Sequence, residues 1–184
     1  MLVTHKKSVN FNPTKEGYLI PYLALTGNFS EPLMQVLHRQ FTSHLTTQKP
    51  HLSIYISRAK APTRKVVNDE EVVTLLKKPG FQTYYFETLT WKQQLSLNYQ
   101  TKYLVGVHDA GLTNMRFMQP NTCVLELRRV QDQHNNCYFS LASALNIHYY
   151  YQCCATDHED TTTANYQVNI QLLEKNIKQM LQND

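Results

Sequence analysis

The sequence lacks several features that mark common protein classes. Its four cysteines, at positions 123, 137, 153 and 154, form no C-x-x-C pair, so a structural zinc site is not expected. No apolar run reaches the roughly 18 residues that a membrane-spanning helix needs. The first residues show no basic-then-apolar leader. We therefore expect reduced thiols and a cytoplasmic location, with any membrane association peripheral or made through a partner.

A strong charge of either sign is also missing. Charged residues make up 17% of the chain and the formal net charge is only +4. No stripe of Lys and Arg interleaved with aromatic residues is present, which argues against a nucleic-acid binder. The mild positive charge would suit a small phosphorylated ligand. With 184 residues, of which 42% are apolar, the chain is long enough to bury a proper core.

Several motifs that would identify a type of reaction or ligand are absent. The spacing around Gly106 and Gly111 is similar to a phosphate-binding P-loop, but Leu112 stands where that motif needs lysine. There is no G-x-S-x-G elbow of the kind that carries a nucleophilic serine. The histidines are too scattered to indicate a metal site, and none is predicted.

What is present is an alternation of strand-like and helix-like segments. The patterns predict strands over 51–57, 82–86, 102–107, 122–127 and 147–151, with 18–25 as a further extended candidate. They predict helices over 30–45, 68–78, 90–100, 110–118 and 136–145, and a long closing helix over 164–181. This order favours an α/β fold, a Rossmann-like parallel sheet with helices on both faces. We expect an N-terminal segment and linker helix over 1–49, followed by a Rossmann-like domain over 50–184.

Ligands of such sheets bind where parallel strands end, near the point at which strand order reverses. The loop that follows the 102–107 strand is the richest candidate, because His108 is followed within three residues by a predicted helix start. Free N–H groups at a helix start suit a diphosphate, and Gly111 would let the backbone approach it. Thr113 and Asn114 would add side-chain donors. A plain strand-to-helix turn is the alternative reading of this loop.

Three charged residues at the same predicted edge are further candidates. Arg58 and Arg64 flank the end of the first strand and could pair with phosphate, the alternative being two solvated surface arginines. Glu126 lies within the apolar 122–127 strand and could accept hydrogen bonds from ribose hydroxyl groups. The alternative for Glu126 is a salt bridge with Arg128 or Arg129.

Taken together, these residues resemble glycosyltransferase family 61. The strongest match is the loop His108-Asp109-Ala110-Gly111-Leu112-Thr113-Asn114, where the family has His-Gly-Ala-Gly-Leu-Thr-Asn. The remaining matching segments occur in the family's order: Ile56-Ser57-Arg58, Arg64, Asn68-Asp69-Glu70, Gly80-Phe81, Glu87, Gln93-Gln94, Phe117-Met118, Pro120 and Val124-Leu125-Glu126-Leu127.

The resemblance implies the C-terminal, donor-binding half of a GT-B glycosyltransferase. It implies inverting, metal-independent transfer of a hexosyl or pentosyl group from a nucleotide sugar, expected to be UDP-linked, to a glycan acceptor in glycan or polysaccharide biosynthesis. No separate cofactor is implied. Catalytic roles in meeting the charge on the leaving diphosphate fall to His108 and Arg58. Donor-binding roles fall to these residues: Arg64, Gly111, Leu112, Thr113, Asn114 and Glu126.

Two departures from the family leave an alternative open. Family members are longer, and their N-terminal acceptor half has no counterpart here, so a partner could supply it. The second departure is Asp109, which stands where the family has glycine. Its carboxylate would either repel a diphosphate or turn away and cap the helix. The alternative function is therefore a catalytically inactive partial glycosyltransferase that serves as a nucleotide-binding or protein-interaction module.

Overall fold

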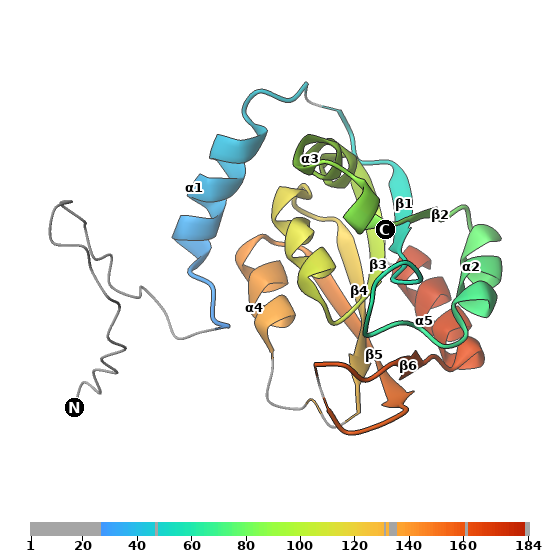
Figure 1. The fold of residues 1–184 in the computed structure, drawn as a ribbon. Coiled ribbons are helices and arrows are strands. Elements are labelled where there is room, and N and C mark those ends of the chain that lie inside the picture. Colours follow the sequence, from blue (N-terminus) through green and yellow to red (C-terminus); the bar gives the residue numbers. More distant parts are fainter. Residues whose placement is uncertain (1–26, 47, 131, 133–135, 161, 183–184) are drawn as a thin grey trace, which may run out of the picture.

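A six-stranded sheet forms the centre of the molecule, with strand order β2-β1-β3-β4-β5-β6. A computed structural model describes residues 27–46, 48–130, 132, 136–160 and 162–182 (Figure 1). The strands are β2 (Gln82–Tyr84), β1 (Leu52–Ile56), β3 (Thr101–Val107), β4 (Cys123–Arg129), β5 (His148–Thr156) and β6 (Tyr166–Gln167). The first five are mutually parallel and β6 pairs antiparallel with β5. The predicted α/β fold with a mostly parallel sheet is confirmed.

Helices cover both faces of the sheet, as predicted, and each face has its own apolar core (Figure 1). One face carries α2 (Asp69–Lys77) and α5 (Ile170–Gln182), which bury Leu76 and Leu173. The other carries α3 (Trp91–Tyr99), the 3-10 helix η2 (Ala110–Phe117) and α4 (Cys137–Ala144). Helix α1 (Glu31–Thr42) packs against α4 and η2, and a short 3-10 turn, η1 (Phe86–Thr88), precedes α3. No helix in the described part of the chain is long and apolar enough to cross a membrane.

The local signals explain most helix boundaries. Thr90 caps α3 with a complete capping box, since its hydroxyl accepts from the Gln93 backbone and the Gln93 side chain accepts from the Thr90 backbone. Ser30 precedes α1 with a proline in the first turn, but its side chain makes no capping hydrogen bond. Gly80 ends the α2 turn with φ +91°, a backbone conformation that glycine adopts without steric cost. The extended segment predicted over 18–25 lies outside the described residues, and the boundary at residue 49 stays a prediction.

The prediction was wrong for the segment between α4 and α5. The strand predicted over 147–151 runs on to Thr156, and the predicted helix over 164–181 begins only at Ile170. The intervening residues form β6 because tertiary partners take their backbone groups. The Tyr166 N–H donates to the Lys65 carbonyl at 2.7 Å, and its carbonyl accepts from the Val67 N–H at 2.8 Å. Helical periodicity in this segment was overridden by these long-range contacts.

The strand order places one reversal in the sheet. From β1 the chain moves outward to β2, and then returns to the other side of β1 to form β3. The carboxyl ends of β1 and β3 therefore lie side by side at the edge where open α/β sheets bind ligands. The loops that begin at Ser57 and His108 meet at this point.

The buried face of α5 supplies the first prediction. Leu173 is fully buried in the core beneath the sheet, whereas its neighbour Leu172 is 40% exposed. Leu173→Ala should lower the free energy of unfolding by about 2–5 kcal/mol, because it leaves a cavity that the core cannot fill. Leu172→Ala should change it by less than about 1 kcal/mol. Urea unfolding of both variants measures the difference, and equal losses would contradict the placement of this helix.

Candidate functional site

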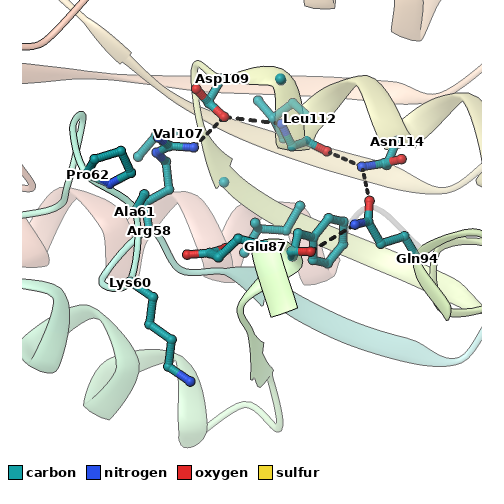
Figure 2. A pocket seen from close by; sticks show the side chains of 15 residues that line it. Arg58, Lys60, Ala61, Pro62, Glu87, Gln94, Val107, Asp109, Leu112 and Asn114 are labelled. Atoms are coloured by element: carbon teal, nitrogen blue, oxygen red, sulfur yellow. Dashed lines mark hydrogen bonds and ion pairs between the residues drawn. The ribbon is translucent and has the colours of Figure 1, made fainter. Parts of the chain in front are cut away.

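A cavity of about 350 Å³ opens where β1 and β3 end (Figure 2). Its walls come from the loop after β1, from η1 and α3, and from the β3–η2 loop. Polar side chains on these walls are Arg58, Lys60, Glu87, Gln94, Asp109 and Asn114. The cavity therefore lies at the strand reversal, beside the loop that the sequence singles out.

The Asp109 carboxylate is the charged centre of this region. One of its oxygens lies 2.5 Å from Nη1 of Arg58, and the other lies 2.6 Å from Nη2 of Arg64. The Asp109 side chain is only 6% exposed, while Arg58 and Arg64 are 17% and 30% exposed. Figure 2 shows Arg58 turned toward Asp109, with Lys60 extending away from it. Neither arginine is the solvated surface residue of the alternative reading.

Asp109 also caps η2. Its backbone is extended (φ −157°), its side chain accepts a hydrogen bond from the Gly111 N–H at 3.4 Å, and its carbonyl accepts from the Leu112 N–H at 2.9 Å. The expected capping role of Asp109 is thus present. Both N–H groups that a phosphate would seek at this helix start are already bonded to Asp109.

Arg64 reaches Asp109 from an unusual backbone conformation. Its φ is +56°, in the left-handed region that costs a non-glycine residue on the order of 1–2 kcal/mol. Its N–H donates to the Thr163 carbonyl at 3.4 Å. A charge-assisted hydrogen bond contributes about 1.5–3 kcal/mol, so the contact with Asp109 is large enough to offset the strain. Strain of this kind is concentrated at functional sites.

The helix after the loop is a 3-10 helix over its whole length, where the prediction was a short helix. Two glycines let it pack tightly on the sheet. A Cβ on Gly106 would lie 3.1 Å from the Leu112 side chain, and a Cβ on Gly111 would lie 3.4 Å from Ile56. Gly111 lines the cavity, but the space beside it is occupied by protein.

The other residues predicted for donor binding lie on η2 and differ in accessibility. Leu112 is fully buried in the core. Asn114 is 8% exposed and its amide donates to the Gln94 side chain at 3.1 Å and to the Gly111 carbonyl at 3.2 Å. Thr113 is half-buried and bonds to Tyr138. Asn114 lines the cavity and joins it to α3 through Gln94 (Figure 2).

His108 and Glu126 form a buried polar array with a third residue, Tyr149. His108 Nδ1 bonds to one oxygen of Glu126, and the Tyr149 hydroxyl donates to the other. His108 directly follows the carboxyl end of β3, Glu126 lies in the middle of β4, and Tyr149 lies near the amino end of β5. Glu126 is only 1% exposed. Burial and the charge of Glu126 raise the pKa of Tyr149 well above its usual value, so its hydroxyl stays protonated and donates.

The array was only partly foreseeable. Sequence reasoning singled out His108 and Glu126 separately and gave Tyr149 no role beyond a strand, because neither pairing can be deduced from spacing along the chain. Glu126 also interacts with Arg128, one of the partners considered for it: burial lowers the Arg128 pKa, but the charge of Glu126 contributes to a net rise. His108 does not line the cavity at Arg58. The contact of Glu126 with a ribose stays a prediction.

Within the described residues, no group of three or more His, Cys, Asp and Glu side chains is arranged to hold a metal ion. Positively charged side chains at this edge include those of Arg58, Arg64 and Lys60.

The buried array supplies a second prediction. Glu126→Gln replaces a carboxylate that serves two partners with an amide, and should lower the free energy of unfolding by about 1.5–3 kcal/mol. Glu87→Gln is the matched control, because Glu87 is exposed, and should have little effect. Urea unfolding measures both variants. A loss no greater in Glu126→Gln than in the control would contradict the array.

Comparison with known proteins adds a relationship to this geometry. The model of the family described as Glycosyltransferase 61 matches residues 15–125. The EGF domain-specific O-linked N-acetylglucosamine transferase of Drosophila melanogaster is 32% identical over 117 residues, which are 62% of this chain and 22% of that protein. The protein of the same name from Mus musculus is 30% identical over 129 residues, 67% of this chain and 24% of its own. The Xenopus laevis protein is 31% identical over 137 residues, which are 71% of this chain and 26% of that protein. The chain spans about a quarter of the length of these relatives.

Proposed function

Because the chain belongs to the glycosyltransferase 61 family, we propose that it is the donor-binding part of a GT-B glycosyltransferase and binds a UDP-linked nucleotide sugar at the cavity beside Asp109. The activity named for these relatives favours N-acetylglucosamine as the first sugar to test. A glycan or glycoprotein would be the acceptor. The remaining part of such an enzyme would come from further polypeptide or from a partner.

The convergence of Arg58 and Arg64 at the strand reversal is the observation that carries this proposal. Two guanidinium groups and one carboxylate leave one net positive charge in this cluster, which attracts an anion. The Nε atom of each arginine is buried and makes no hydrogen bond within the described residues, so the hydrogen-bonding capacity of neither guanidinium group is fully used. Bidentate guanidinium groups are the usual partners of phosphate oxygens.

In the proposed reaction an acceptor hydroxyl attacks the anomeric carbon of the sugar in line. A new carbon–oxygen bond forms on one side, while the bond to the diphosphate breaks on the other, so the configuration inverts. The acceptor proton passes to a base that we do not assign. No metal is invoked: Arg58, Arg64 and the start of η2 would meet the charge that develops on the leaving diphosphate, with His108 contributing from the adjoining array.

Asp109 competes with the donor in this scheme. Two unit charges 4 Å apart interact by about 4 kcal/mol at an effective dielectric constant near 20, so a diphosphate and the Asp109 carboxylate cannot share the arginines without a large penalty. A helix start contributes only about 0.3–1 kcal/mol toward an anion. The donor must therefore displace Asp109 from the arginines, and we expect weak binding by the unmodified chain.

The second candidate function is the inactive partial glycosyltransferase, and Asp109 is the observation that favours it. A carboxylate that already pairs with both arginines and accepts from the Gly111 N–H stands in for the anion that the fold would otherwise bind. A chain with this permanent internal anion would keep the fold and serve as a protein-interaction module.

Calorimetric titration with uridine diphosphate separates the two functions. Asp109→Gly restores the residue that the family carries here, and Asp109→Asn removes the charge while it keeps one side-chain oxygen as an acceptor. Under the first function both variants should bind at least about tenfold more tightly than the unmodified chain, equivalent to about 1.4 kcal/mol, because the arginines are freed. Absence of binding in all three proteins would leave the inactive module as the function.

Arg58 provides an independent test of the same site. Arg58→Ala in the Asp109→Asn background should weaken uridine diphosphate binding by at least about 1 kcal/mol, because one charge-assisted hydrogen bond is lost. Arg39→Ala is the matched control, since Arg39 is an exposed arginine on α1 away from this loop. Unchanged affinity in Arg58→Ala would remove Arg58 from the site.

A further inference from the structure

A second cleft, of about 630 Å³, opens at the end of β4 and along one face of β5. We call it the aromatic cleft and define it by the residues Arg128, Asp132, Asn136, Phe139, Tyr149 and Tyr151. Its volume is within the range of pockets that take drug-sized ligands. The aromatic cleft is separate from the cavity at which the nucleotide sugar is proposed to bind.

Three rings form one wall of the aromatic cleft. Tyr149 and Tyr151 stand next to each other on β5 with ring planes 27° apart and centroids 6.3 Å apart. Phe139 of α4 meets Tyr149 edge-on at 5.6 Å. Phe139 is 54% exposed and Tyr151 is 57% exposed. Large apolar side chains that gather on the surface beside polar groups mark a binding site.

The rest of the lining of the aromatic cleft is largely polar and carries both signs of charge. Arg128 bonds to the Asn136 side chain at 3.5 Å and to the Asp132 carbonyl, and its guanidinium group lies 5.7 Å from the centre of the Tyr151 ring. A phosphate group would meet the Asp132 carboxylate here, and a cation would meet Arg128. Arg129 also lines the cleft, and its guanidinium group donates to the Glu159 carbonyl. A ligand whose groups both donate and accept hydrogen bonds suits this mixed lining.

We propose that the aromatic cleft binds a pyranose ring of a glycan. A pyranose presents apolar C–H groups that can lie against the exposed Tyr151 and Phe139 rings. Its hydroxyl groups both donate and accept, so neighbouring hydroxyls satisfy a carboxylate, an amide and a guanidinium group at once. The cleft has room for more than one such ring.

A nucleobase fits the same wall less well. A flat ring held between two others needs about 7 Å between them, because carbon atoms touch at about 3.5 Å. The centroids of Tyr149 and Tyr151 are only 6.3 Å apart, so no base enters between them. A base could rest only on an outer face and would leave the side formed by Arg128 and Asp132 largely unfilled.

Two residues connect the aromatic cleft with His108. The Asp132 carboxylate lies 3.7 Å from His108 Nε2, and Tyr149 reaches His108 through Glu126. A sugar seated in the aromatic cleft would thus lie beside His108, on the acceptor or sugar side of the proposed transfer. That consequence rests on the proposed function, whereas binding of the sugar ring does not.

Saturation-transfer-difference NMR tests the proposal with methyl β-glucoside, methyl N-acetyl-β-glucosaminide and uridine as probes. We expect saturation of the ring protons of at least one glycoside, lost or weakened at least about fivefold in Tyr151→Ala and in Phe139→Ala. Tyr151→Phe keeps the ring and should keep binding. The mutated side chains are exposed, so thermal unfolding should show all three variants folded.

Three results would overturn the proposal. They are no saturation of either glycoside, unchanged saturation in Tyr151→Ala, or a response to uridine alone that depends on Tyr151. None of these results depends on uridine diphosphate binding at Arg58. Loss of the donor site with retention of glycoside binding would refute only the proposed function.

Discussion

The contact of Asp109 with Arg58 and Arg64 is the interaction on which the ligand edge depends. It ties the loop after β1 to the loop after β3, two segments about fifty residues apart in the chain that meet only because the strand order reverses between them. The same carboxylate fixes the start of η2 and offsets the left-handed backbone of Arg64. Substitution of this one side chain would therefore alter loop geometry, helix start and local charge together.

A second, buried set of contacts fixes the middle of the edge. Glu126 of β4 bonds to His108, which follows β3, and to Tyr149 of β5, so it links three neighbouring strands. Because the carboxylate is almost fully buried, these contacts are stronger than they would be at the surface, and loss of either partner would leave a costly group unpaired. The array of His108, Glu126 and Tyr149 thus lies between the cavity at Arg58 and the aromatic cleft.

Periodicity and capping signals were enough to predict the parallel sheet, its layers and most elements, because apolar spacing and residues such as Thr90 act locally. They failed at residues 164–169, where hydrogen bonds to Lys65 and Val67 decide the conformation. The predicted strand ends directed attention to Arg58 and His108, and the structure brings both to one edge. The sequence could not predict that Asp109 would form ion pairs with both arginines, or that Tyr149 would hydrogen-bond to Glu126. Such pairings depend on three-dimensional proximity, which linear spacing does not encode.

The two edge strands of the described sheet determine how another chain could associate with it. One border is the three-residue β2, and the other is the two-residue β6, whose outer side is covered by hydrogen bonds from Lys65 and Val67. Short or covered border strands offer few unpaired backbone groups to another chain, which protects against aggregation by strand addition. A companion polypeptide would accordingly dock through side chains on helices or loops and would not lengthen the β ladder.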